Sequence, residues 1–205
     1  ARFGAGREFQ QFVYVSVGTG ISSTLVVDGV PFAGARGSAV VLSTGPISVP
    51  DDHGGWSRFV LEEYASGPAL VKRYAAATGR AVPHAEALLV AAASGDADAA
   101  SIIDSAALAL GSAIAWLINV LDPQAIVLGG GLGSAAGRFQ DGVRTAIAEH
   151  VWNPDSRDLP VLPAALGADA GLIGAALSAA AHASLPRPAT ERRDQPLNEQ
   201  TPPTS

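Results

Sequence analysis

The chain has 205 residues, 48% of them hydrophobic and 16% charged, which is typical of a compact globular protein and excludes an intrinsically disordered one. Its net charge of −6, without any basic run, argues against a nucleic-acid-binding surface. The sequence contains no cysteine, which excludes disulfides and thiolate chemistry and suits the cytoplasm, and we expect no apolar run to reach transmembrane length.

The amino-terminal part is predicted to form a meander of three short antiparallel strands. Strands are expected at 12–17 and 21–27, with Gly18-Thr19-Gly20 as the turn between them. Asp28-Gly29 is a strong hairpin signal, and a third strand is expected to begin at Val30.

A long loop and a series of helices are predicted to follow. Residues 33–56 are rich in Gly, Ser and Pro, and loops of this length are usually functional or disordered. The last predicted helix shows apolar residues at three- and four-residue steps over a long stretch. The helices are expected over residues 56–66, 68–77, 84–93 and 96–121.

The stretch after the long helix is the most informative one. The helix should end at Asp122, because the following Pro123 disfavours helix for the residue before it. Residues 125–128 are wholly apolar, as expected of a strand in a sheet covered on both faces. Gly129, Gly130 and Gly131 follow, at the place where open α/β sheets bind ligands. They indicate either a nucleotide site or only a tight strand-to-helix turn.

The remaining elements complete a mixed α/β pattern with helices on the faces of a sheet. A helix is predicted over 138–151, and a strand over 159–162 whose early proline favours an edge position. A final helix should run from 167 to 183, with Asp169 as its N-cap. We therefore expect one domain over residues 1–183 and a disordered tail over 184–205, which has almost no large apolar residue.

The Gly18-Thr19-Gly20 turn also has two interpretations. Its backbone N–H groups could form an anion-binding nest, to which the Thr19 hydroxyl adds a hydrogen bond to phosphate. It could instead be an ordinary glycine-rich turn, and the motif by itself favours this second interpretation.

Several segments taken together carry a family resemblance. As a set and in this order they resemble the ROK family of sugar kinases and sugar-responsive repressors, over about residues 1–183. The segments are Phe3-Gly-Ala-Gly6, Val17-Gly-Thr-Gly20, Leu61-Glu-Glu-Tyr-Ala-Ser-Gly67, Asp122-Pro-Gln-Ala-Ile-Val-Leu-Gly-Gly-Gly131 and Leu166-Gly-Ala-Asp-Ala-Gly-Leu-Ile-Gly-Ala-Ala176.

The resemblance implies an actin-like, ribonuclease-H-like ATPase fold and transfer of the γ-phosphate of ATP, with magnesium, to a sugar hydroxyl. It also implies that the glycine turns hold the nucleotide. The cofactor-binding residues would then be Gly18, Thr19, Gly20, Gly129, Gly130 and Gly131.

The sugar side departs from the family pattern. The family has a Gly-Glu-x-Gly-His segment after Gly-Ala-x-Gly, whereas Val41 and Thr44 stand here at the positions of its sugar-binding Glu and His. Glu62 matches the family's second sugar-contacting Glu and is the expected substrate-binding residue. It could instead be a simple carboxylate on a helix surface, because its expected neighbours are missing.

The family's zinc loop is also absent. That loop carries several cysteines, and the corresponding stretch here, which starts at His53, has none, so a thiolate zinc site is impossible. We expect no structural zinc and interpret His53 as a solvated loop residue and not a ligand.

The first residues do not resemble a natural start, since segment 1–7 lacks an initiating Met and reads as a loop. The family's catalytic Asp lies in a segment upstream of Phe-Gly-Ala-Gly, so no catalytic residue is assigned.

Three hypotheses stay open: the nucleotide-side half of a sugar kinase, inactive alone; a non-catalytic sugar- or nucleotide-sensing module of a regulator; or a structural remnant. Expected partners are a sugar, adenine nucleotide, and a second copy or partner lobe, without nucleic acid or membrane.

Overall fold

The computed structural model describes residues 3–50 and 55–183, and these divide between two compact units whose boundary in the sequence follows Gly167. Of the second unit the structure describes one long helix, α7 (Ala170–Ala183), which begins directly after Asp169 as predicted. The predicted disordered tail over 184–205 lies outside the described residues.

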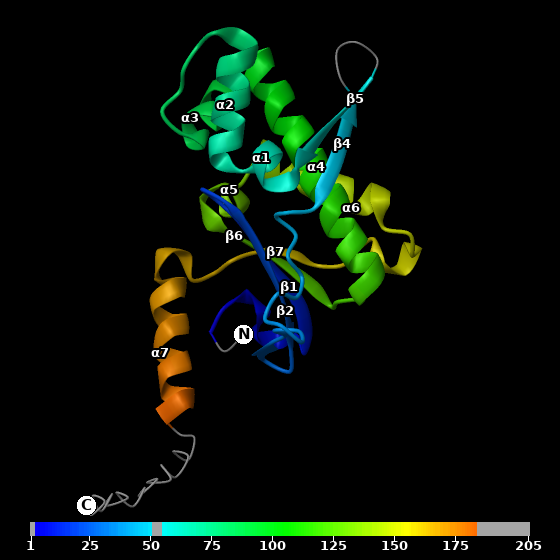
Figure 1. The fold of residues 1–205 in the computed structure, drawn as a ribbon, viewed down its shortest axis with the longest axis vertical. Helices are drawn as coiled ribbons and strands as arrows, with labels where there is room; N and C mark the ends of the chain where they lie inside the picture. Colours follow the sequence, from blue (N-terminus) through cyan, green and yellow to red (C-terminus); the bar gives the residue numbers. More distant parts are fainter. Residues whose placement is uncertain (1–2, 51–54, 184–205) are drawn as a thin grey trace, which may run out of the picture. The chain divides into compact units, whose positions relative to one another are not determined.

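A five-stranded mixed sheet forms the centre of the first unit (Figure 1). Its strand order is β3-β2-β1-β6-β7, with β1 antiparallel to β2 and parallel to β6, and with β6 parallel to β7. The predicted meander and the edge position of the last strand are thereby confirmed. The strands are β1 (Gln11–Val17), β2 (Ile21–Val27), β3 (Val30–Pro31), β6 (Ala125–Gly129) and β7 (Val161–Pro163).

The pairing of β1 with β6 decides where the glycine motifs lie. Every residue of β6 is buried, which confirms the prediction of a strand covered on both faces. The two strands run parallel with Ser16 opposite Gly129, so their carboxyl ends meet at one edge of the sheet. The turn after β1 and the glycines after β6 therefore lie next to each other.

The long predicted helix is α4 (Ala97–Leu121), and it is the central element of the core. Ile103, Leu110 and Ile114 are completely buried along it. The helix ends where predicted, at Asp122, which adopts a left-handed conformation (φ 46°) before Pro123. Around α4 pack α2 (Gly67–Thr78), α3 (Ala85–Ala93) and α6 (Arg138–His150).

By length and composition α4 is apolar enough to cross a membrane, so the expectation that no apolar run reaches that length was wrong. More than half of its apolar window, 56%, is buried inside the protein. Packing on several sides explains the buried apolar residues, whereas Leu108, Trp116 and Val120 of the same helix are exposed.

The segment 46–66 differs from its prediction. Residues 46–50 and 56–60 form an antiparallel hairpin of β4 (Pro46–Pro50) and β5 (Trp56–Val60), and only α1 (Leu61–Ala65) is helical. The predicted helix over 56–66 was therefore wrong in its first half. The local spacing of Phe59, Val60 and Tyr64 fits a helix, but pairing with β4, an earlier segment of the chain, determines the backbone of β5.

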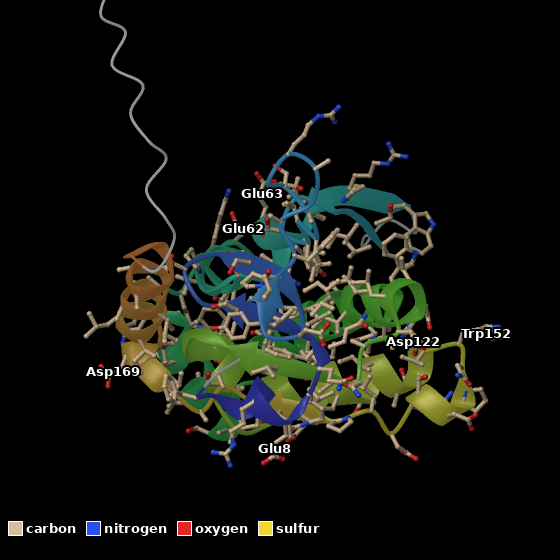
Figure 2. The ribbon with its side chains drawn as sticks, turned by 90° about the horizontal axis from the view of Figure 1, so that it is seen from below. Glu8, Glu62, Glu63, Asp122, Trp152 and Asp169 are labelled. Carbon is tan, nitrogen blue, oxygen red and sulfur yellow. The ribbon has the colours of Figure 1, made fainter. Side chains whose placement is uncertain are left out.

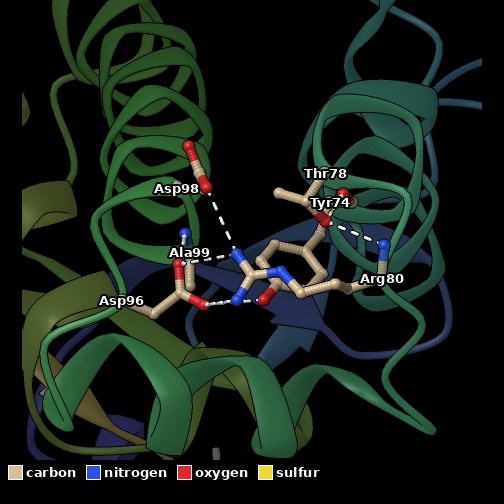
Figure 3. A network of polar contacts seen from close by, with 6 residues as sticks. All are labelled: Tyr74, Thr78, Arg80, Asp96, Asp98 and Ala99. Carbon is tan, nitrogen blue, oxygen red and sulfur yellow. Dashed lines mark hydrogen bonds and ion pairs between the residues drawn. The ribbon is translucent and has the colours of Figure 1, made fainter.

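A polar network holds α2 against the start of α4 (Figure 3). The Tyr74 hydroxyl donates to Asp96 Oδ2 over 2.6 Å, and Asp96 Oδ1 caps α4 by accepting from the Ala99 N–H over 3.0 Å. Arg80 pairs with Asp96 and Asp98 over 2.9 and 3.2 Å. The Tyr74 hydroxyl, followed by the Ala99 N–H, lowers the pKa of Asp96 to about 2, because both bonds favour the carboxylate.

Candidate functional site

The two glycine motifs of the sequence meet at the edge where β1 and β6 end. A Cβ atom placed on Gly18 would be only 3.8 Å from the backbone nitrogen of Gly131. Thr19 is exposed at the tip of the β1–β2 turn, and the turn is closed by a hydrogen bond from the Gly18 N–H to the Gly20 carbonyl over 2.9 Å. Segments far apart in the chain thus form one glycine-rich surface.

The amino terminus of α2 is fastened to the β1–β2 turn. The Gly67 N–H donates to the Gly18 carbonyl over 2.8 Å, and a Cβ on Gly67 would approach that oxygen to 2.9 Å. The side chain of Ser66 is buried and caps the same helix by accepting from the Ala69 N–H. These contacts satisfy N–H groups that have no partner within the helix, and they fix the turn in place.

Glu62, on α1 (Figure 2), contacts the same turn from another side. Its Oε2 accepts a hydrogen bond from the Ile21 N–H over 2.7 Å. A Cβ on Gly20 would lie 2.7 Å from that oxygen, so the carboxylate would have to shift if this position carried a side chain. One oxygen of Glu62 is thus bound to the backbone of β2, and its contact with a sugar stays a prediction.

The glycines after β6 have different roles. Gly130 has φ 79°, and a Cβ there would coincide with the backbone carbonyl of Val17, so only glycine fits. Gly129 is buried, and a Cβ there would collide with the hydroxyl of Tyr14. Gly131 is exposed and lies in the first turn of a short helix, α5 (Gly130–Ser134).

Two hollows adjoin this surface, and they share Gly18, Thr19 and Gly131. Hollow A has a volume of about 580 Å³ and hollow B of about 550 Å³, within the usual range for small-molecule sites. Hollow A is also lined by Gly67, Pro68, Val71, Lys72, Pro83, His84, Ala85, Glu86 and Leu132, and hollow B by Ser16, Gly20, Ile21, Ser22, Glu62 and Gly130. Gly129 lines neither hollow.

The charged residues of hollow A were not predicted from the sequence. Lys72 is the only lysine of the chain, and it shares one face of α2 with Pro68 and Val71 at helical spacing. Glu86 and His84 come from the start of α3. The helical spacing of Pro68, Val71 and Lys72 after the Ser-Gly-Pro helix start could have predicted that these residues share one face of α2. No local pattern indicates that residues of α3 line the same hollow.

His84 makes two contacts through one nitrogen. Its Nδ1 lies 3.2 Å from the Ala87 N–H, which it caps, and 3.1 Å from Glu86 Oε2. The cap needs a lone pair on Nδ1, and an ion pair with Glu86 needs a proton there. The two contacts therefore exclude each other, and a capping His84 leaves the Glu86 carboxylate without that donor.

The residues at the degenerate sugar positions lie away from hollow B. Neither Val41 nor Thr44 lines it, and Val41 instead lines a third, apolar hollow of about 530 Å³ together with Trp116. Val40 has φ 57°, which is rare for a β-branched residue, at the position of the first glycine in the family's Gly-Glu-x-Gly-His segment. The Ser23 hydroxyl holds this strained loop by donating to the Val40 carbonyl.

Of the stretch expected to correspond to the zinc loop, the described residues 56–60 form β5, which pairs with β4. Within residues 3–50 and 55–183 there is no group of three or more His, Asp or Glu side chains that could hold a metal ion. His53 lies outside the described residues.

Comparison with known proteins gives one consistent picture. The model of the ROK family matches residues 1–182. The chain is 40% identical to the bifunctional enzyme NanE/NanK of Brucella melitensis, over 89% of the chain and 33% of the relative. The chain thus spans about a third of that relative's length.

Solved structures agree. A ROK family glucokinase from Streptomyces griseus, in complex with glucose and AMPPNP, is 28% identical with a TM-score of 0.72, over 86% of this chain and 62% of that one. A ROK family transcriptional regulator, a homologue of the E. coli MLC protein, is 26% identical with a TM-score of 0.70, over 86% and 47%. The fold is the α/β fold of the actin-like ATPases, as the resemblance implied.

Proposed function

Because this chain belongs to the ROK family, we propose that it is the nucleotide-side half of an ATP-dependent sugar kinase, which transfers the γ-phosphoryl group of ATP to a hexose hydroxyl. The observation that carries this proposal is the junction of hollows A and B at Gly18, Thr19 and Gly131. A nucleotide across this junction has its nucleoside in hollow A and its terminal phosphate at the edge of hollow B. The Streptomyces griseus complex with glucose and AMPPNP supports both ligand classes.

The chemistry assigns a task to each side of the junction. The bond between the γ-phosphorus and the β,γ-bridging oxygen breaks, a bond to the sugar oxygen forms, the hydroxyl proton passes to a base, and ADP leaves. The turn at Gly18–Gly20 binds phosphate through the backbone, and Gly130 and Gly131 allow the rest of the nucleotide to approach the main chain closely. Magnesium, held mainly by phosphate oxygens, supplies charge neutralisation when bound, which fits a site without a cluster of protein ligands among the described residues.

On the acceptor side, Glu62 is the proposed sugar contact. Its Oε2 is bound to Ile21, which leaves Oε1 for a sugar hydroxyl in hollow B. Glu62 is the only carboxylate among the residues that line hollow B, so no side chain is left there for the role of general base. We therefore expect the 205-residue chain alone not to phosphorylate sugars, and to act in the cytoplasm together with a partner lobe.

Calorimetry with ATP and magnesium tests nucleotide binding by the chain. The parent should bind ATP weakly, and Gly131→Val should abolish binding because its side chain enters the space between hollows A and B. Gly171→Val, at an exposed glycine of α7 with open space around it, is the matched control, provided that its circular dichroism is unchanged. Equal affinities of the parent and Gly131→Val would show that the site lies elsewhere.

A sugar-sensing module without kinase activity is the second candidate. The observation that favours it is that Val41, expected at the position of the family's sugar-binding Glu, lines an apolar hollow and not hollow B, whereas the glycine turns border hollows A and B. A coupled ADP-release assay over hexoses and N-acetylhexosamines discriminates between the two, when the chain is supplied with the amino-terminal lobe of a related kinase. Turnover that Glu62→Ala abolishes supports the kinase, and sugar binding without turnover supports the sensor.

A further inference from the structure

Two opposite charges line hollow A, and they come from different helices. Lys72 belongs to α2 and Glu86 to α3, and both side chains are exposed to solvent. In the part of the chain that the structure describes, Lys72 has no ion pair or hydrogen bond through its side chain. Among the described residues Glu86 makes one ion pair, with His84, and that contact competes with the capping of α3.

The Glu86 carboxylate extends toward the glycine turn. Its Oε1 lies 3.2 Å from the position that a Cβ on Gly131 would take, so the absence of a side chain at Gly131 leaves this oxygen open to the hollow. A carboxylate accepts hydrogen bonds and repels phosphate, which makes hydroxyl groups its natural partners. In nucleotide sites of α/β proteins an acidic side chain that binds ribose hydroxyls is a recurrent solution.

The remaining walls of hollow A fit a flat apolar group. Pro68 and Val71 line it from α2, and Pro83 and Leu132 line it from the segments before α3 and after β6. Ligand sites are mostly apolar with a few placed polar groups that fix orientation, and hollow A has this composition. A heterocyclic base is the part of a nucleotide that such walls would cover.

Lys72 supplies the positive charge that a phosphate requires. A lysine ammonium is a compact point charge on a flexible stem, suited to phosphate at the mouth of a site. Lys72 lies one turn beyond Pro68 on α2, whose amino terminus is bound to the Gly18 carbonyl. It therefore stands on the wall of the hollow that adjoins the phosphate-binding turn.

We propose that hollow A selects ribonucleotides: Glu86 accepts hydrogen bonds from the ribose hydroxyls, and Lys72 pairs with a phosphate of the same nucleotide. This inference rests on the proposed function, because it assigns the nucleotide's parts within the same site. It makes Glu86 the residue that distinguishes ATP from deoxy-ATP, and Lys72 the residue that distinguishes ATP from adenosine.

Calorimetry with ATP and 2′-deoxy-ATP, each with magnesium, tests the role of Glu86. The parent should bind ATP about tenfold more tightly, as expected for loss of a hydrogen bond to a charged acceptor. Glu86→Ala should weaken ATP binding and make the two affinities equal, and Glu86→Gln should fall between. Glu149→Gln, an exposed carboxylate on α6, is the control and should keep the parent's preference.

Because Lys72 is the only lysine, amine acetylation followed by peptide mass spectrometry reports on it alone apart from the chain's amino terminus. ATP should protect Lys72 from acetylation severalfold and adenosine should not. Lys72→Met should weaken binding of ATP and leave binding of adenosine unchanged, which a purely structural role of the side chain would not produce.

The outcomes separate the inference from its premise. Failure of the parent to bind any nucleotide would overturn the proposed function and this inference with it. ATP binding with the same preference over 2′-deoxy-ATP in Glu86→Ala as in the parent, or Lys72 acetylated equally with and without ATP, would overturn the inference and leave the proposed function standing.

Discussion

The N–H of Ile21 lies 2.7 Å from Oε2 of Glu62, so the first residue of β2 is bound to the first turn of α1. The Ile21 side chain is buried, and the bond fixes the turn that carries Gly18, Thr19 and Gly20. A residue expected to contact sugar thus also has a structural role at the turn that is proposed to bind phosphate, and this leads to the first prediction.

Glu62→Ala should lower the free energy of unfolding by about 1–3 kcal/mol, because it leaves the N–H of Ile21 without its acceptor. Glu62→Gln should recover most of the loss, since its amide oxygen can accept the same bond. Urea unfolding followed by circular dichroism measures both. Glu63→Ala, the exposed neighbour, is the control, and an equal loss in Glu62→Ala and Glu63→Ala would contradict the prediction.

Val40→Gly should be more stable than Val40→Ala by about 1 kcal/mol, because both remove a half-buried side chain that packs against the core and only glycine relieves the backbone strain. The φ of 57° at Val40 is left-handed, a conformation that costs roughly 1–2 kcal/mol for a residue with a Cβ and little for glycine, whose extra freedom in the unfolded chain offsets part of the gain. Val41→Gly and Val41→Ala are the matched control pair, since Val41 has no positive φ, and there the glycine variant should be the less stable one. Urea unfolding in which Val40→Gly is no more stable than Val40→Ala would refute the strain at Val40.

Gly111→Ala should destabilise the protein despite the higher helix propensity of alanine. Its Cβ would lie 2.5 Å from the Cβ of Ala146 and 2.7 Å from the Val143 carbonyl, where α4 and α6 pack closely. Overpacking of about 1–3 kcal/mol then exceeds a propensity gain of about 1 kcal/mol. Gly174→Ala, with open space around it in α7, is the control and should be neutral or stabilising. Thermal unfolding followed by circular dichroism measures both variants.

Acid should weaken the contact between α2 and α4 through Asp96. Its pKa of about 2 in the folded state is below the unfolded value of about 3.9, so its stabilising contribution is complete above about pH 4 and is lost as the pH falls through about 2. Asp96→Asn and Tyr74→Phe should both flatten the dependence of the free energy of unfolding on pH between 2 and 5. A parental slope in Asp96→Asn would assign the acid sensitivity to other groups.

The sequence by itself determined the parts whose signals are local. The apolar steps of 97–121, the buried run before Gly129 and the glycine and proline positions predicted α4, β6 and their ends, because each depends on periodicity or on the backbone of one residue. The ordered set of glycine motifs also predicted the family, which the family model over residues 1–182 confirms.

Only the tertiary structure decided how distant segments share a site. β5 became a strand because Trp56–Val60 pairs with β4, against its helical spacing. Lys72 and Glu86 line one hollow because α2 and α3 pack beside each other on α4, which no local pattern records. Glu62 binds Ile21 for the same reason: a hydrogen bond between segments far apart in sequence depends on the packing of the whole unit and not on the residues around either partner.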